Sequence, residues 1–309
     1  MKKEERKELI KELFQNNAKR IQKMINFLEL NHHLNKEYQK KYTLSTISQQ
    51  KIPVEKLWVL FVSALNSGPS NNLSNAGYSI EKFLEIMKPL ENKDSITINE
   101  FLDCCNKHIN EKEEHYSLKL NSINDFFTYT TSDKVFPGIG KKKCALFIRN
   151  LKIVQDESEK KIFSDSNLDF TNDCYIALDI VITYVLNKIL KLPDKLSDNP
   201  EFEINQYYDF YTINKVFKCD EIFKYKSDFM IIEDLWFWGY FNQRTEVIQK
   251  ANKQNKKNIT ERKFEFNDAK FISDSHNFPS DYIKNIIENK SKEFRNIVEQ
   301  KGHELKRRM

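Results

Sequence analysis

The chain has 309 residues, a formal net charge of +5 and a hydrophobic fraction of 39%. Its 6 glycines and 7 prolines argue against a β-rich fold with many tight turns, and they exclude collagen-like or proline-rich disordered chains. The apolar fraction is large enough for a hydrophobic core, and the mildly basic balance suits a polyanion such as nucleic acid. The composition therefore predicts a soluble, helical protein with two domains or one two-lobed unit.

The patterning along the chain predicts an all-α protein. The apolar run 174–190 is shorter than the ~20 residues of a membrane span and contains Asp179, so we expect a buried helix and no membrane. A polar turn at 66–72, an acidic insertion at 152–173 and a linker at 251–263 separate the helices. We expect N-terminal charged helices in 1–50, a core in 51–250 and a linker with a C-terminal helix in 251–309. Helices are predicted over 1–45, 54–65, 73–87, 98–107, 120–129, 174–190, 230–250 and 280–308.

Cysteine usage and the N-terminus bear on location. The five cysteines lack the spacing of metal ligands, so no metal site is expected. Their odd number fits a reducing compartment. The charged start of the chain has no apolar segment behind it, so no secretory signal is expected. These features predict a cytoplasmic protein.

The most informative segment runs from Val135 to Phe147, VFPGIGKKKCALF. Gly138 and Gly140 flank Ile139, a pattern that lets two helices meet at a tight turn because glycine adopts positive φ freely. The first N–H groups of the second helix then point outward, where their partial positive charge suits a phosphate oxygen. Lysines at 141–143 oppose the helix dipole, so an anionic ligand explains them better than local stability does. The alternative is a helical hairpin with merely solvated lysines.

Asp179 interrupts an apolar stretch, YIALDIVI. A buried carboxylate without a partner costs several kcal/mol. Such a residue is therefore either satisfied, as by capping a helix, or retained for chemistry. The residue pattern leaves both readings open.

Together these two segments resemble the helix-hairpin-helix DNA glycosylase superfamily, of the endonuclease III and 8-oxoguanine glycosylase type. Members carry a hairpin of the form (L/F)PG(I/V)G-x-K, here within 123–151, and a later helix that opens with an apolar-Asp-apolar stretch, here in 174–190. The resemblance implies a two-lobed helical bundle with a cleft between the lobes. It also implies Lys142 as the catalytic amine and Asp179 as the catalytic carboxylate.

The resemblance implies further contacts with DNA. Helix 57–65 and the polar turn after it are similar to the family segment that fills the gap left by an extruded base. Aromatic residues would line the base pocket, although core packing is the alternative for most of them. The implied DNA-binding residues are Gly138, Gly140, Lys141, Lys143, Ser70, Asn71 and Asn72, and the implied pocket residues are Phe147, Trp236, Trp238 and Phe241.

The sequence also departs from the family. Lys142 and Asp179 are 37 residues apart, longer than is usual, and we attribute the excess to the insertion 152–173. Only Cys219 follows Asp179, so the four-cysteine iron–sulfur cluster of endonuclease III is not expected. No cofactor is required, and a monovalent cation at the backbone carbonyls of the hairpin is compatible with the family.

The expected function is base-excision repair. A monomer would bind double-stranded DNA that contains a damaged base, an oxidised purine above all, and would be nucleoid-associated when bound. It would act as a DNA glycosylase and AP lyase through a Lys Schiff base. Three alternatives remain: a monofunctional glycosylase in which Asp179 activates water, a non-catalytic helix-hairpin-helix DNA-binding protein, and a helical protein–protein module.

Overall fold

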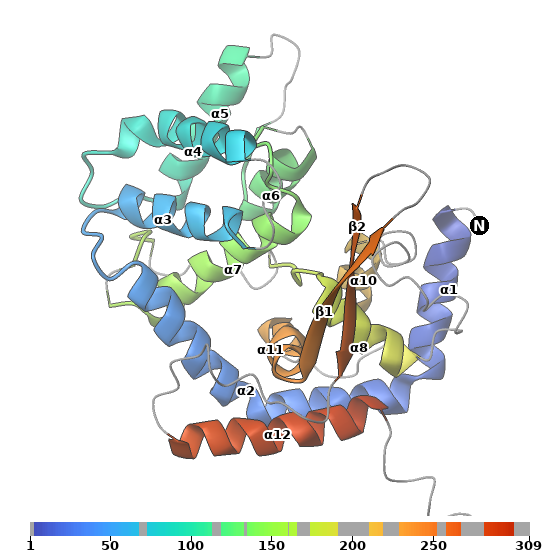
Figure 1. The fold of residues 1–309 in the computed structure, drawn as a ribbon. Coiled ribbons are helices and arrows are strands. Elements are labelled where there is room, and N and C mark those ends of the chain that lie inside the picture. Colours follow the sequence, from blue (N-terminus) through green and yellow to red (C-terminus); the bar gives the residue numbers. More distant parts are fainter. Residues whose placement is uncertain are drawn as a thin grey trace, which may run out of the picture. The chain divides into compact units, whose positions relative to one another are not determined.

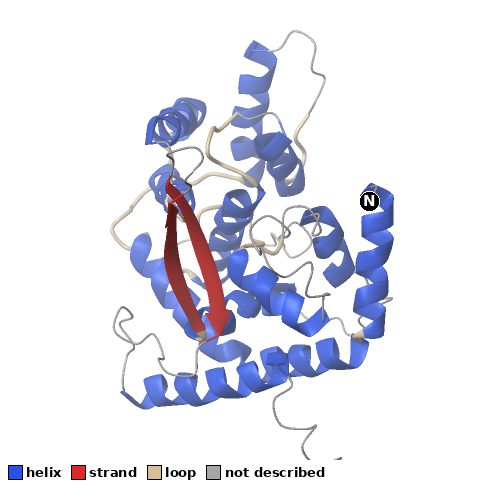
Figure 2. Ribbon diagram, turned by 45° about the vertical axis from the view of Figure 1, so that its right-hand side comes forward, coloured by secondary structure: helices blue, strands red, loops and turns tan. Residues whose placement is uncertain are grey.

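The computed structural model is mostly helical, as the composition predicts, and contains one hairpin of two strands (Figures 1 and 2). In the part of the chain that the structure describes, no helix is both long and apolar enough to cross a bilayer. The described residues are 3–67, 73–112, 119–132, 135–159, 161–165, 174–190, 210–218, 229–251, 258–266 and 281–299.

The chain forms two compact units. One comprises Met1–Asn35 together with Leu178–Met309, and the other comprises Lys36–Ala177. Helix α2 (Ala18–Thr46) contributes residues to both. This division differs from the boundaries expected at 50 and 250, because residues 1–35 group with the C-terminal half of the chain. Aromatic packing contributes to this grouping, since Phe14 lies 5.3 Å from Phe217 between ring centroids.

The unit 36–177 is a bundle in which α3 packs between α4 and α7, while α6 packs on α7 and α5 on α4 (Figure 1). Its core is a cluster of phenylalanines, in which Phe61 stacks on Phe83 at 4.2 Å and also contacts Phe147. The elements are α3 (Pro53–Leu65), α4 (Leu73–Met87), η1 (Lys88–Leu90), α5 (Ile98–Lys112), α6 (Ile123–Ser132) and α7 (Lys141–Glu157).

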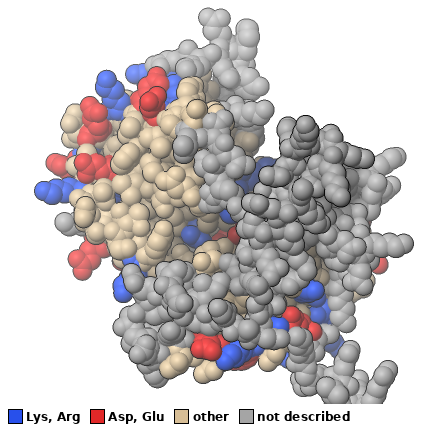
Figure 3. Space-filling model, viewed as in Figure 1, with Lys and Arg blue, Asp and Glu red and all other residues tan. Residues whose placement is uncertain are grey.

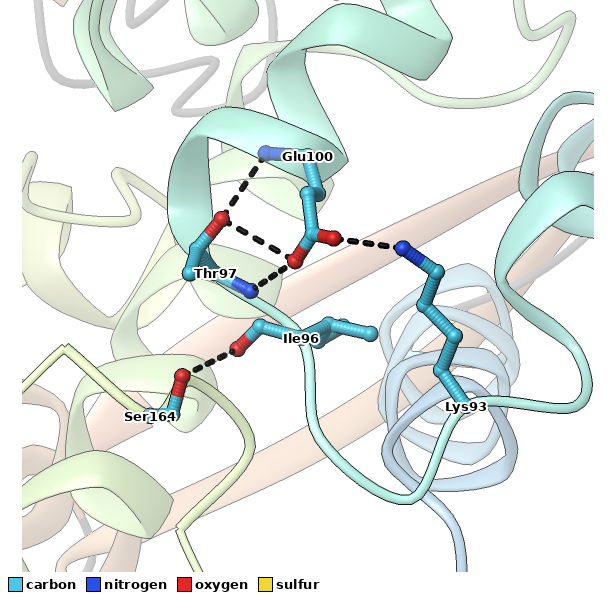
Figure 4. Close-up of polar contacts among 5 residues, drawn as sticks. All are labelled: Lys93, Ile96, Thr97, Glu100 and Ser164. Carbon is cyan, nitrogen blue, oxygen red and sulfur yellow. Dashed lines mark hydrogen bonds and ion pairs between the residues drawn. The ribbon is translucent and has the colours of Figure 1, made fainter.

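Helix α5 begins with a capping box, drawn in Figure 4. The Thr97 hydroxyl accepts a hydrogen bond from the Glu100 backbone N–H at 3.2 Å, and the Glu100 carboxylate accepts one from the Thr97 backbone N–H at 2.7 Å. Lys93 donates to the other oxygen of Glu100. Ser164 donates its hydroxyl to the Ile96 carbonyl at 3.2 Å, which joins the segment after α7 to the start of α5.

The predicted insertion 152–173 is helical in its first part, because α7 continues to Glu157. The next residues are fixed to the bundle: the Gln155 side chain hydrogen-bonds both the backbone N–H and the carbonyl of Phe163, which is fully buried. Residues 166–173 lie outside the described part of the chain. The continuation of α7 follows from its apolar positions, since Val154 is also fully buried.

The unit 1–35 with 178–309 is built around α11. Gly239 lies against α8 so closely that a Cβ there would be 2.6 Å from Cγ1 of Val181. Trp238 packs edge-on against Phe27 of α2, with ring centroids 5.3 Å apart. In addition to α2, the elements are α1 (Lys3–Asn16), α8 (Ile180–Leu190), α10 (Phe210–Lys218), η4 (Phe229–Glu233), α11 (Asp234–Phe241), β1 (Gln243–Ala251), β2 (Asn258–Phe266) and α12 (Asp281–Glu299).

Two predicted boundaries in this unit are wrong. The single helix over 1–45 is two helices, because the Asn17 side chain caps α1 by donating to the Leu13 carbonyl at 2.9 Å. The helix over 230–250 ends at Phe241, where the Asn242 side chain donates to the Trp238 carbonyl at 2.9 Å. The described part of the C-terminal helix ends at residue 299, and the rest of 280–308 lies outside the described residues.

The largest departure from an all-α fold is the antiparallel pair β1 and β2. It occupies the end of the predicted helix 230–250 and the predicted linker 251–263 (Figure 2). Gln243 lies opposite Phe266, and Ala251 lies opposite Asn258. Both strands contain β-branched residues, in the sequences RTEVIQ of β1 and NITERKF of β2, and such residues favour strands over helices.

Candidate nucleic-acid interface at the turn between α6 and α7

The turn before α7 has the conformation that glycine permits. Gly138 has φ of +88°, the left-handed region that other residues rarely adopt. The Ile139 backbone N–H donates to the Phe136 carbonyl at 2.9 Å, which closes the turn, and the Ile139 side chain is buried as expected. Gly138 itself is exposed. The tight turn therefore depends on one glycine rather than two.

Gly140 serves a different purpose from the one expected. Its φ of −97° and ψ of −178° are extended backbone that any residue adopts, and none of the described atoms lies within 4 Å of where its Cβ would be. It is the N-cap residue of α7, and no side chain caps this helix end. The fold therefore leaves the exposed start of α7 without the Ser, Thr, Asp or Asn that usually satisfies the first N–H groups.

The turn is held by helices α3 and α4. The buried Ser79 hydroxyl of α4 donates to the Pro137 carbonyl at 2.6 Å. A Cβ on Gly138 would be 3.9 Å from Cβ of Asn75 and 3.9 Å from Cδ2 of Leu65. The end of α3 and the start of α4 therefore lie directly beside the turn.

Lys143 joins the start of α7 to the end of α3. Its Nζ donates to the Leu65 carbonyl at 2.6 Å. Burial, with a smaller contribution from the nearby charge of Lys142, lowers the pKa of Lys143 below its ordinary value. Lys143 therefore has a partner within the protein, the Leu65 carbonyl in the last turn of α3, and its implied contact with DNA stays a prediction.

Lys141 and Lys142 lie in the first turn of α7 and are half-buried. No acidic residue occurs in that turn. On the face shown in Figure 3, acidic and basic side chains of the described residues are interspersed. The positive character of the turn is therefore local, and it comes from these lysines and the uncapped N–H groups.

Ser70, Asn71 and Asn72 lie outside the described residues, so their predicted contact with DNA stays a prediction. The residues on either side of the segment are described, however. Leu65 ends α3 and Asn75 lies in the first turn of α4, and both are close to Gly138. The ends of the polar segment are thus anchored beside the turn that precedes α7.

Asp179 is a helix cap. Helix α8 begins at Ile180 rather than at 174, and 174–179 is not helical, which corrects the predicted helix 174–190. The Asp179 carboxylate accepts hydrogen bonds from the backbone N–H groups of Val181 at 2.9 Å and Ile182 at 3.0 Å. The side chain is half-buried rather than fully buried. Capping is thus sufficient to explain a carboxylate at this position, and a chemical role stays a prediction.

Lys142 and Asp179 belong to different units, 36–177 and 178–309. Their predicted convergence at one site therefore stays a prediction, as does a cleft between two lobes.

The aromatic residues assigned to a base pocket are mostly core residues. Phe147, Trp238 and Phe241 are each at most 2% exposed. This assignment is wrong for these three residues because no surface of theirs is available to a base. Trp236 differs, since it is half-buried and stacks on Tyr240 with ring centroids 4.9 Å apart.

The sequence patterns did not predict a polar cluster formed by His32, Asn35 and Asp234 in the unit 1–35 with 178–309. The fully buried Asp234 carboxylate accepts a hydrogen bond from the Asn35 side chain at 2.6 Å and lies 3.0 Å from Nδ1 of His32. It opens α11 immediately before the run LWFWGYF, as Asp179 precedes IVITYVL. In the sequence, the position of Asp234 just before an apolar helix was the one signal for this cluster. The partners of Asp234, His32 and Asn35, are about 200 positions away, and no sequence pattern marks them.

Among the described residues, no group of three or more His, Cys, Asp or Glu side chains is arranged to hold a metal ion. The monovalent cation expected at the hairpin carbonyls stays a prediction; the carbonyls of Phe136 and Pro137 each accept a hydrogen bond. Comparisons with protein-family models, curated proteins and solved structures find no match to this chain.

Proposed function

We propose that the chain is a DNA glycosylase with AP lyase activity, which grips the DNA backbone at the turn before α7 and uses Lys142 as its nucleophile. The observation that carries the proposal is the start of α7. Gly140 leaves this helix end exposed and uncapped although its backbone does not require glycine. A phosphate oxygen that accepts from the backbone N–H groups of this first turn accounts for both features.

Two further observations support contact with a phosphate backbone. Hydrogen bonds from Ser79 and Lys143 tie the turn and the start of α7 to α4 and α3. Lys141 and Lys142 are partly exposed in the same turn of helix. Contacts of this kind position DNA without reading its bases. The protein would therefore bind duplexes of many sequences and find its substrate by extruding a damaged base.

The proposed reaction uses the neutral amine of Lys142. Its nitrogen attacks C1′ of the deoxyribose while the bond from C1′ to the base breaks, and the base leaves with the bonding electrons and takes up a proton. Ring opening then gives an imine between Nζ and C1′. Loss of a proton from C2′ expels the 3′ phosphate oxygen and nicks the strand, and water hydrolyses the imine to regenerate the amine.

Lys141 and Lys143 flank Lys142 in sequence, so three consecutive lysines occupy the first turn of α7. In the proposed mechanism, the carboxylate of Asp179 stabilises positive charge that develops on the sugar as the base departs.

A second candidate is a DNA-binding protein without catalysis. One observation favours it: Asp179 already has a structural role as the cap of α8. In that case the hairpin would bind duplex DNA, but neither base release nor strand nicking would follow. The monofunctional glycosylase, in which Asp179 activates water, predicts base release without nicking.

A panel of labelled duplexes, each with one damaged base, separates these candidates. The proposal predicts that the full chain nicks at least one oxidised-purine duplex without added alkali, and that Lys142→Gln does not. If the base is released but the strand is nicked only after alkali is added, the chain is a monofunctional glycosylase and not a lyase. Binding without either product would leave the non-catalytic protein, and absence of salt-dependent binding would refute every DNA-based candidate.

A further inference from the structure

Helix α4 places an exposed tyrosine beside the turn between α6 and α7. Tyr78 is 51% exposed. Its neighbour Ser79 is fully buried and holds the Pro137 carbonyl of the turn at 2.6 Å. The burial of Ser79 and the exposure of Tyr78 fix the orientation of this part of α4 relative to the turn.

The register of α4 brings Tyr78 to the edge of the surface that meets the turn. Asn75 and Ser79 are four residues apart and therefore lie on one side of the helix, where both approach the turn. Tyr78 is three residues after Asn75 and so lies on the adjoining strip of the same surface. Gly77 next to it is exposed, with no described atom within 4 Å of its Cβ position. None of the described residues therefore covers α4 at Gly77, next to the exposed Tyr78.

The charges on α4 indicate from which side a polyanion would approach. The first turn of α4 contains no acidic residue, whereas Glu81 and Glu85 are exposed in its second half. A phosphate backbone held at Lys141 and Lys142 would therefore pass over the first half of the helix, where Tyr78 is the exposed large side chain. Its ring is well suited to pack against a sugar or a base, since aromatic rings stack on nucleobases without reading their sequence.

We propose that Tyr78 is a second contact of the DNA-binding surface, packing against a sugar or base of the strand whose phosphate is held at the start of α7. The proposal rests on the proposed function and adds a contact outside the hairpin. It assigns to Tyr78 an apolar contribution to affinity, which does not depend on counterion release, while Lys141 provides an ionic contribution, which does.

Fluorescence anisotropy with the full chain tests this assignment. The probe is a labelled duplex with one tetrahydrofuran abasic-site analogue, titrated at several salt concentrations. Tyr78→Ala and Tyr78→Gln are expected to weaken binding about fivefold or more at every salt concentration, with the slope of log K against log salt unchanged. Tyr78→Phe keeps the ring and should bind within about twofold of wild type.

Leu84→Ala is the matched control, because Leu84 is also exposed on α4, at 42%, but lies on another side of the helix. It should bind as wild type does. Wild-type affinity in Tyr78→Ala and Tyr78→Gln overturns the proposal while the proposed function stands, and so does an equal loss in Leu84→Ala. Wild-type protein that does not bind the duplex overturns both. Thermal unfolding midpoints equal to wild type show that the variants are folded.

Discussion

The Lys143 ammonium donates a hydrogen bond of 2.6 Å to the Leu65 carbonyl, joining the first turn of α7 to the last turn of α3. The bond satisfies a carbonyl that the helix itself leaves without a partner, and a cation is favourable at that end of the α3 dipole. One of the three consecutive lysines is thus structural.

Replacing Lys143 with Met should therefore destabilise the protein. We expect a loss of about 1 kcal/mol, the usual contribution of such a hydrogen bond. Lys141 lies two residues before Lys143 in the same helical turn. Lys141→Met should leave the free energy of unfolding within about 0.5 kcal/mol of wild type. Urea denaturation monitored by circular dichroism measures both, and equal stabilities for the two variants would contradict the structural role of Lys143.

The two glycines of the turn should respond oppositely to alanine. Gly138→Ala forces a side chain into positive φ and should cost about 1–2 kcal/mol of stability. Gly140→Ala should leave stability unchanged, since its backbone is extended and its Cβ meets open space. If phosphate approaches this helix end, the added methyl should reduce duplex affinity about tenfold, the loss of one charge-assisted hydrogen bond. Unchanged affinity in a folded Gly140→Ala protein argues against that approach.

Asp179 permits a separation of capping from chemistry. Asn caps helices about as well as Asp, so Asp179→Asn should keep the stability of wild type, whereas Asp179→Ala should lose about 1 kcal/mol. If the carboxylate is catalytic, both variants should lose base release, because both remove the charge. An Asp179→Asn protein with full activity would reduce this residue to a cap. Denaturation and a base-release assay on the same preparations give the comparison.

Glu100 should make stability depend on pH in acid. The hydrogen bond from Lys93, followed by those from the backbone and hydroxyl of Thr97, lowers the pKa of Glu100 from 4.5 to about 2. Because the folded state holds the carboxylate charged, its contribution is complete above about pH 4.5 and is lost as pH falls toward 2.

Denaturant midpoints at several pH values test this. Glu100→Gln should be less stable than wild type at neutral pH, and the difference should narrow between pH 4.5 and about 2. Glu91→Gln, an exposed neighbour outside the network of Figure 4, serves as the control. A difference that stays constant over this range would show that the hydrogen bonds of Glu100 do not depend on its charge.

Much of the fold followed from local pattern. Helix α3 runs from Pro53 to Leu65, close to the predicted range 54–65, and the turn with Gly138 lies where the motif predicts it. These features depend on neighbouring residues alone. The predicted helix through 243–250 failed because β1 obtains its hydrogen bonds from β2, a partner that helical periodicity does not reveal.

The site was harder to predict than the fold. The three consecutive lysines identified the first turn of α7. They did not reveal that Lys143 differs from its two neighbours, because its partner Leu65 is 78 positions away. The aromatic run around Trp238 gave the same pattern for a pocket and for a core, and only its contact with Phe27 decides in favour of the core. Long-range contacts thus account for most of the errors.

Borohydride trapping tests the central claim most directly. Borohydride reduces an imine between Lys142 and the sugar to a stable amine, so an active lyase becomes covalently attached to a labelled damaged duplex and moves slowly in a denaturing gel. Wild type and Lys141→Gln should both give the attached species, and Lys142→Gln should give none. Trapping by Lys142→Gln at the wild-type level, or none by wild type on any oxidised-purine duplex, would contradict Lys142 as the nucleophile.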